Sequence, residues 1–108
     1  VTRDPAHGFL LTIGAGGVLT ELWQDTVSML LPVTPAQIQD ALQNLRIAPL
    51  LNGYRGKPGA DLGAITKAIM SVQAYVIAHQ DAISEVEVNP LICGTDSAIA
   101  VDALIRRT

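Results

Sequence analysis

The chain has 108 residues, a formal net charge of −3 and 49% hydrophobic residues, which suits one small domain with a single core. Its seven lysines and arginines are scattered, so the composition excludes the basic groove of a nucleic-acid-binding protein. No apolar segment approaches the length of a membrane span and no signal peptide is visible, so we expect no membrane partner.

Charged residues make up 16% of the chain, well below the roughly 25% of average soluble domains. This deficit predicts that part of the surface is covered by another domain or by a second copy of the chain. The single cysteine, Cys93, excludes an internal disulfide and favours a reducing, cytoplasmic location. Cys93 falls in an apolar segment, so we expect a buried and inert thiol. Because the chain begins at Val1 rather than at a methionine, we expect it to be a piece of a longer protein.

The N-terminal part of the chain predicts three strands, at residues 9–13, 18–23 and 27–31. A glycine-rich segment at residues 14–17 separates the first two strands and is typical of a hairpin turn. It does not predict a phosphate-binding loop, because no Gly-Lys-Ser/Thr sequence follows it and the next segment is a strand.

Two helices are expected in the middle of the chain. Thr34 and Gln37 form a capping box with a proline at the first helical position, and Pro49 is expected to end this helix. Asp61 is placed to cap a second, longer helix that fades near His79. Apolar residues recur every three or four positions in both helices. The predicted core residues are Ile38, Leu42, Leu45, Leu62, Ile65, Ile69, Val72 and Val76.

The segment between the two helices, residues 50–59, contains three glycines and two cations, Arg55 and Lys57. Such a loop can present a guanidinium or an ammonium group to a phosphate. It can equally be a plain connection between helices. The sequence leaves both interpretations open.

The last part of the chain predicts the hairpin around which the domain is organised. Residues 85–93 and 98–103 alternate with the period of a strand, and residues 94–97 have turn chemistry. A two-residue or a four-residue turn pairs Cys93 with Ala98. The same register places Asn89 opposite Asp102, with Cβ atoms about 5 Å apart. A three-residue turn would shift the register by one and turn Asp102 away from Asn89.

In the first register, three oxygen-bearing side chains share one strand face: Glu87, Asn89 and Asp102. Carboxylate and amide oxygens are the ligands that Mg²⁺ prefers in proteins. The pattern therefore predicts a metal pair formed by Asn89 and Asp102, with Glu87 beside it. An ordinary solvated strand face is the alternative interpretation.

The expected order of elements is βββααββ in one domain, residues 1–108. This order predicts an α+β fold with a mainly antiparallel sheet and two helices on one face. The opposite face would be open to solvent or to a second domain. The two histidines, His7 and His79, have no nucleophile and no complete set of metal ligands around them in the sequence, so we expect structural or surface roles.

Five segments, taken in order, resemble one known family. They are Arg3-Asp4-Pro5…Gly8, Gly14-Ala15-Gly16-Gly17…Glu21…Asp25, Pro49-Leu50-Leu51-Asn52-Gly53-Tyr54-Arg55-Gly56, Glu87-Val88-Asn89-Pro90-Leu91 and Val101-Asp102-Ala103. Together they are similar to the C-terminal part of the ATP-grasp domain of NDP-forming acyl-CoA synthetases, over residues 3–105. The last two are also similar to the β subunit of succinyl-CoA synthetase.

The resemblance implies an enzyme that converts an acyl-CoA, ADP and phosphate to an acid, CoA and ATP through a phosphohistidine. The nucleotide, ATP or ADP, would lie with Mg²⁺ between two α+β subdomains. Asn89 and Asp102 match the metal-binding residues of the family, and Glu87 matches the acidic residue two positions before the asparagine. The assignments that follow are Arg55 and Glu87 to nucleotide or phosphate binding, and Asn89 and Asp102 to the metal.

The resemblance also implies limits. The chain lacks the preceding half of the ATP-grasp domain, with its adenine pocket and phosphate-binding lysine, and lacks the CoA-binding domains, so it is expected to be inactive alone. His7 stands where the family more often has an aromatic residue, and it is not the phosphorylated histidine. The same domain occurs in protein lysine acetyltransferases as a degenerate regulatory module, which is the alternative function. Asn89 and Asp102 favour a parent that binds nucleotide.

Overall fold

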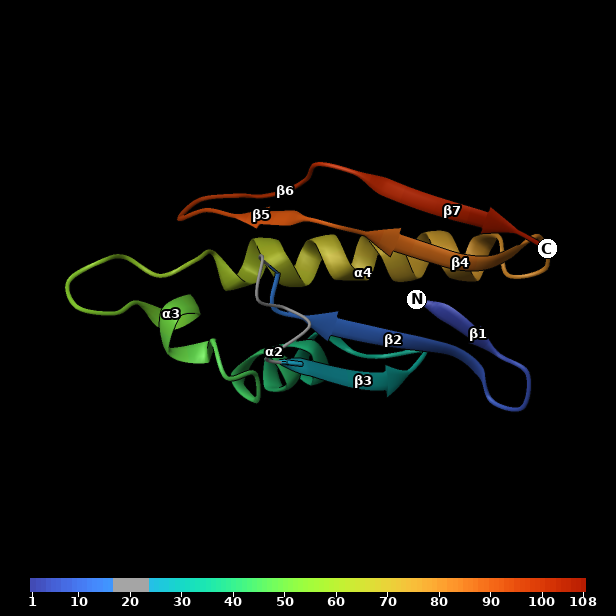
Figure 1. Cartoon of the computed structure of the whole chain (residues 1–108), viewed down its shortest axis with the longest axis horizontal. Coiled ribbons are helices and arrows are strands. Elements are labelled where there is room, and N and C mark those ends of the chain that lie inside the picture. Colours follow the sequence, from blue (N-terminus) through green and yellow to red (C-terminus); the bar gives the residue numbers. More distant parts are fainter. Residues whose placement is uncertain (17–23) are drawn as a thin grey trace.

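The computed structural model describes residues 1–16 and 24–108 of the chain. The molecule is elongated, with α2 and α4 on the same side of the strands (Figure 1). The elements are β1 (Thr2–Asp4), β2 (Gly8–Gly14), β3 (Thr26–Leu30), α2 (Pro35–Gln43), α3 (Ala48–Asn52), α4 (Leu62–Ala78), β4 (Ile83–Val88), β5 (Leu91–Cys93), β6 (Ala98–Ala100) and β7 (Ala103–Arg107).

The described strands form a five-stranded sheet of order β3-β2-β1-β4-β7 and a separate two-stranded hairpin of β5 and β6. Every pairing is antiparallel, so the predicted α+β class with a mainly antiparallel sheet is confirmed. The central strand, β1, is absent from the sequence prediction. Three residues directly before a proline are too few to show the alternation that reveals a strand.

The predicted helix caps are confirmed. The Thr34 hydroxyl accepts the Gln37 backbone N–H at 3.2 Å, and the Gln37 side chain accepts the Thr34 N–H at 2.8 Å. Asp61 accepts the Ala64 N–H at 2.9 Å at the start of α4. These bonds satisfy backbone donors that a helix start would otherwise leave unpaired.

The core lies between the strands and the helices. Its most buried predicted members, Ile38 and Val76, have no exposed surface. Because α2 and α4 place one apolar stripe each against the sheet, burial follows the three-and-four spacing of the sequence. The two clusters of buried side chains comprise Leu11, Val33, Ile38, Leu42, Leu45, Ile65 and Ile69, and Phe9, Val76, Ile83 and Val86.

The prediction that Pro49 ends the first helix is wrong, because α2 already ends at Gln43 and Pro49 lies in the first turn of a further helix, α3. Proline suits the first turn of a helix, where its missing N–H is not needed. The described residues therefore contain three helices rather than two. The carboxylate of the buried residue Asp25 accepts the backbone N–H groups of Arg46 and Ile47, at 2.6 and 3.0 Å, directly before α3.

The predicted strand at residues 18–23 lies outside the described residues, as does Gly17, the last residue of the predicted glycine-rich turn before it. The strand expected at residues 27–31 is confirmed as β3, which pairs with β2 from Leu10–Leu30 to Gly14–Thr26. Within residues 1–16 and 24–108, no helix is long and apolar enough to cross a membrane.

Candidate metal and nucleotide site

The site begins with the register of the C-terminal strands. From Glu85 to Cys93 one register runs through both pairs, β4 with β7 and β5 with β6, after a register shift between Ile83 and Glu85. Between these pairs Asn89 lies opposite Asp102, and the Asn89 N–H donates to the Asp102 carbonyl at 3.1 Å. The Gly94 N–H donates to the Ser97 carbonyl at 2.8 Å, which closes a two-residue turn. The expected pairing is confirmed, and a three-residue turn is excluded.

The predicted polar residues lie around one open hollow of about 330 Å³, which is lined by Glu87, Asn89, Asp102, Ala103 and Leu104. Glu87, Asn89 and Asp102 are all exposed, while Val86, next to Glu87, is buried against the helices. The Asp102 carboxylate accepts the Ala103 N–H through one oxygen, Oδ1, at 2.9 Å. This bond orients the carboxylate and leaves its second oxygen available to a ligand.

The donor set of the hollow fits Mg²⁺ shared with a phosphate better than a metal held by protein alone. In the part of the chain that the structure describes, no group of three or more His, Cys, Asp or Glu residues could hold a metal. Mg²⁺ usually takes one or two carboxylates and completes its shell with water and phosphate oxygens. The Asp102 carboxylate and the Asn89 amide oxygen match that minimal set, and Glu87 adds a second carboxylate to the hollow.

Arg55 is not among the residues that line the hollow. The loop that connects α3 to α4 lies at one end of the molecule, whereas the junction of β4 and β5 lies near its middle (Figure 1). Backbone hydrogen bonds of 3.2 and 3.0 Å between Tyr54 and Lys57 make Arg55 and Gly56 a two-residue turn, with φ of 50° at Arg55 and 76° at Gly56. The Arg55 guanidinium lies 5.2 Å from the centre of the Tyr54 ring.

The same sheet face carries two residues that the sequence prediction missed. Leu104 pairs with Glu87, and Arg106 pairs with Glu85. The Nε atom of Arg106 lies 2.7 Å from Oε2 of Glu85. Both residues follow Asp102 at even spacing in an extended strand, which is the pattern that could have identified them.

The prediction that Cys93 is buried is wrong, because its side chain is exposed. Cys93 ends β5, and the tip of the β5–β6 hairpin reaches past the start of α4, where no helix covers it (Figure 1). Partial burial still raises the pKa of the Cys93 thiol above its usual value, which favours the protonated form at neutral pH.

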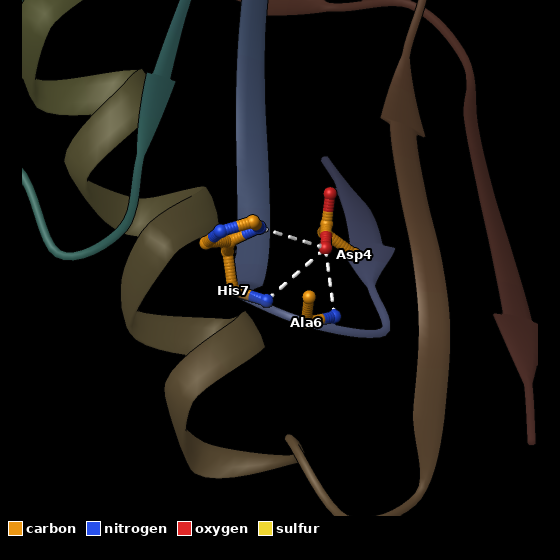
Figure 2. Close-up of polar contacts among 3 residues, drawn as sticks. All are labelled: Asp4, Ala6 and His7. Atoms are coloured by element: carbon orange, nitrogen blue, oxygen red, sulfur yellow. Dashed lines mark hydrogen bonds and ion pairs between the residues drawn. The ribbon is translucent and has the colours of Figure 1, made fainter.

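His7 lies in the turn between β1 and β2 and interacts with Asp4 (Figure 2). One oxygen of Asp4 accepts the Ala6 N–H at 2.8 Å and the His7 N–H at 3.1 Å, and lies 3.2 Å from His7 Nδ1. These bonds, that of Ala6 first, lower the pKa of the Asp4 carboxyl below its usual value. His79 stacks on Tyr75 with ring centres 4.2 Å apart. Both histidines therefore make local structural contacts.

The model of a known family, the ATP-grasp domain, matches residues 1–106 of this chain. The chain belongs to the ATP-grasp family. The match includes the strands that carry Asn89 and Asp102 and all the helices that the structure describes. The family expected from the five sequence segments is therefore confirmed.

Among ATP-grasp relatives, the β subunit of ADP-forming acetate–CoA ligase II from Pyrococcus furiosus is 31% identical over 107 residues, which are 97% of this chain and 45% of that protein. A trans-feruloyl-CoA synthase from an unidentified prokaryote is 34% identical over 95% of this chain and 15% of its own length. The chain therefore spans less than half of the curated relatives that it matches.

A solved structure of acetyl-coenzyme A synthetase 1 from Candidatus Korarchaeum cryptofilum superposes with a TM-score of 0.90 at 28% identity, over 99% of this chain and 50% of that one. That protein was solved with coenzyme A and Mg-AMPPCP, and its phosphohistidine segment points towards its nucleotide-binding site. The ATP-grasp fold of the present chain thus has a close counterpart in a nucleotide-bound synthetase.

Proposed function

We propose that this chain is the C-terminal subdomain of an ATP-grasp domain and supplies one wall of a Mg-nucleotide site in an acid–CoA ligase. The reaction proposed is acyl-CoA, ADP and phosphate to acid, CoA and ATP, through a phosphohistidine. The observation that carries this proposal is the register that places Asn89 opposite Asp102 at an open hollow. The names of the relatives, which are ligases and synthases of acyl-CoA compounds, support the reaction class.

In this proposal the residues of the hollow act by position and charge. The Asp102 carboxylate and the Asn89 amide oxygen would hold Mg²⁺, and Glu87, which lines the same hollow, would lie beside the metal. Bound Mg²⁺ neutralises charge on the transferring phosphoryl group. Phosphoryl transfer needs little covalent help from the protein, so fixed oxygen ligands on paired strands suit the task.

The remaining parts of the site would come from outside this chain: the first ATP-grasp subdomain and the CoA-binding domains. We call a protein that joins these parts to this chain the intact protein. Its acyl-CoA-dependent formation of ATP from ADP and phosphate is the direct test of the proposal. Absence of ATP formation with any short-chain or aromatic acyl-CoA, despite binding of Mg–ADP, would contradict the ligase reaction.

The alternative, a regulatory ATP-grasp-like module, has no support from the relatives. None of those described above carries the name of an acetyltransferase. The hollow also keeps the side chains that a metal–nucleotide site needs, whereas a degenerate module has no use for them.

The isolated chain is expected to bind Mg–ATP with a dissociation constant weaker than about 1 mM, because one wall leaves most of the nucleotide in water. Two or three oxygen ligands alone also hold Mg²⁺ loosely, since this ion gives up its water reluctantly. Isothermal titration of the chain with Mg–ATP measures this. Micromolar binding by a monomeric chain would show that the site is complete without a second subdomain.

The isolated chain is also expected to self-associate through its open face. Ile92 and Ile99 form a cross-strand pair and are 53% and 59% exposed, and Val101 is 62% exposed. Covering such surface gains about 25 cal/mol per Å². Light scattering measures the association, and Ile99→Lys, which places a charge in the apolar pair, is expected to reduce it. A strictly monomeric chain at high concentration would contradict the expectation.

Arg55 is proposed to neutralise a phosphate that another part of the intact protein brings to its loop, since the loop lies away from the hollow. Arg55→Lys is expected to raise the KM for phosphate several-fold, about 3- to 10-fold, because an ammonium cannot replace a two-pronged guanidinium contact. Lys57→Arg, two positions along the same loop, is the matched control. An unchanged KM for phosphate in Arg55→Lys would contradict phosphate binding and show that the loop is a structural connection.

A further inference from the structure

The central strand of the sheet, β1, is shorter than both of its neighbours. It has three residues, whereas β2 on one side has seven and β4 on the other side has six. Both neighbours run past the N-terminus of the chain, which lies between them (Figure 1). Since adjacent strands lie about 4.8 Å apart, β2 and β4 are separated there by about 10 Å, which is the room that one strand takes. We call this place the open strand position.

The hydrogen bonds between β1 and β4 indicate that their ladder can continue into the open strand position. The Val1 nitrogen donates to the Val86 carbonyl at 2.6 Å, and the Val86 N–H donates to the Val1 carbonyl at 2.9 Å. Such doubly bonded pairs recur at every second residue of an antiparallel ladder. The next backbone groups of β4 that face this side belong to Val88. Within residues 1–16 and 24–108, no strand pairs with them.

The other wall of the open strand position, β2, offers a matching set of backbone groups. The Leu31 N–H donates to the Phe9 carbonyl at 2.9 Å, so the odd-numbered residues of β2 bond to β3 and the even-numbered residues face β1. Leu10 pairs with Thr2 of β1. The next even-numbered residue, Thr12, pairs with no strand on this side in the described part of the chain.

The amino group of Val1 is poorly suited to its place at the mouth of the open strand position. Burial lowers the pKa of this ammonium group below its usual value, although the carboxylates of Glu85 and Glu87 act in the opposite direction. A partly buried charge is unfavourable. The N–H of a peptide bond can donate the same hydrogen bond to the Val86 carbonyl without a charge. This place therefore suits a continuing backbone better than a free amino group.

We propose that, in the intact protein, an extended segment joined to the Val1 nitrogen fills the open strand position and continues β1 antiparallel to β2 and β4. The register of β1 with its two neighbours fixes the new pairs. The residue joined to Val1 pairs with Thr12, and the residue before it pairs with Val88. Each of these two residues has to donate its backbone N–H, so neither is proline.

The side chains of this segment alternate between the two faces of the sheet. Val1 packs against both clusters of buried side chains, whereas Thr2 is exposed. The residue joined to Val1 therefore lies on the open face, directly across from Glu87, and the residue before it faces the helices. Because Glu87 lines the hollow, the continued strand adds one side chain to the rim of the candidate metal site.

Hydrogen exchange of single backbone amides tests the proposal, in the isolated chain at a concentration where it is monomeric and in the intact protein. The amides of Thr12 and Val88 are expected to exchange at least about 100-fold more slowly in the intact protein. Leu11 and Glu87 are the matched controls, because their amides bond to β3 and β7 and should be protected in both. Equally fast exchange of Thr12 and Val88 in the two proteins would overturn the inference.

A variant of the intact protein distinguishes strand pairing from simple coverage by another domain. Proline in place of both residues directly before Val1 removes the two N–H donors. It is expected to abolish the extra protection of Thr12 and Val88 and to preserve that of Leu11 and Glu87, which reports that the rest of the sheet is folded. If Thr12 and Val88 stay protected, another part of the protein covers them and the inference is wrong. Neither measurement involves a nucleotide, so its failure leaves the proposed function standing.

Discussion

Asp102→Ala in the intact protein is expected to lower the rate of phosphoryl transfer at least about 100-fold, equivalent to about 2.7 kcal/mol of transition-state stabilisation. The change removes the one carboxylate that lies opposite Asn89 and leaves Glu87 as the only carboxylate among the residues that line the hollow. Initial rates of acyl-CoA-dependent ATP formation, at saturating ADP and phosphate and a range of Mg²⁺ concentrations, measure the effect.

The control for this substitution is Asp81→Ala. Asp81 is also an exposed aspartate, but it lies in the turn between α4 and β4 and does not line the hollow. Its replacement is expected to leave the rate within about twofold, as most exposed substitutions do. The Asp102 side chain is exposed as well, so both variants should have the same melting temperature as the parent protein. Near-normal turnover by Asp102→Ala at ordinary Mg²⁺ concentration would refute the metal assignment.

Asp25→Ala is expected to destabilise the chain by about 2–4 kcal/mol. The Asp25 carboxylate is 6% exposed and accepts the N–H groups of Arg46 and Ile47. Alanine would leave both donors without a partner at the start of α3. The midpoint of urea unfolding, followed by circular dichroism, measures the loss.

Two further variants distinguish the loss of the Asp25 hydrogen bonds from the mere loss of a negative charge. Asp40→Ala removes an exposed aspartate from α2 and is expected to change the free energy of unfolding by less than about 0.5 kcal/mol. Asp25→Asn keeps one acceptor oxygen, so its loss of unfolding free energy should lie between those of Asp25→Ala and Asp40→Ala. Equal losses for Asp25→Ala and Asp40→Ala would show that the two backbone bonds contribute nothing to stability.

Local sequence determined much of the fold. The capping residues Thr34 and Asp61 mark the starts of α2 and α4 because a cap bonds to a backbone N–H only two or three residues away. The register of Asn89 with Asp102 follows from strand alternation and the length of one turn, both of which are local properties. The membership of the ATP-grasp family likewise follows from short segments in a fixed order.

Contacts between distant segments account for what sequence patterns did not reveal. The start of α3 depends on Asp25, 21 and 22 residues before its two partners, so Pro49 alone was a misleading signal. The strand β1 is too short to form by itself and exists between β2 and β4. Exposure of Cys93 reflects where the helices end rather than its apolar neighbours.

For the site, strand period in the sequence limited the facing oxygen ligands to two possible registers, which differ in the length of one turn. The two-residue turn in the structure selected the register that pairs Asn89 with Asp102. Only the tertiary structure decided what surrounds them. It placed the Arg55 loop away from the hollow and set Arg106 beside Glu85 on the open face. The physical reason is that the position of a cation relative to a ligand depends on how separate strands and loops are arranged in space, which no periodicity within one segment encodes.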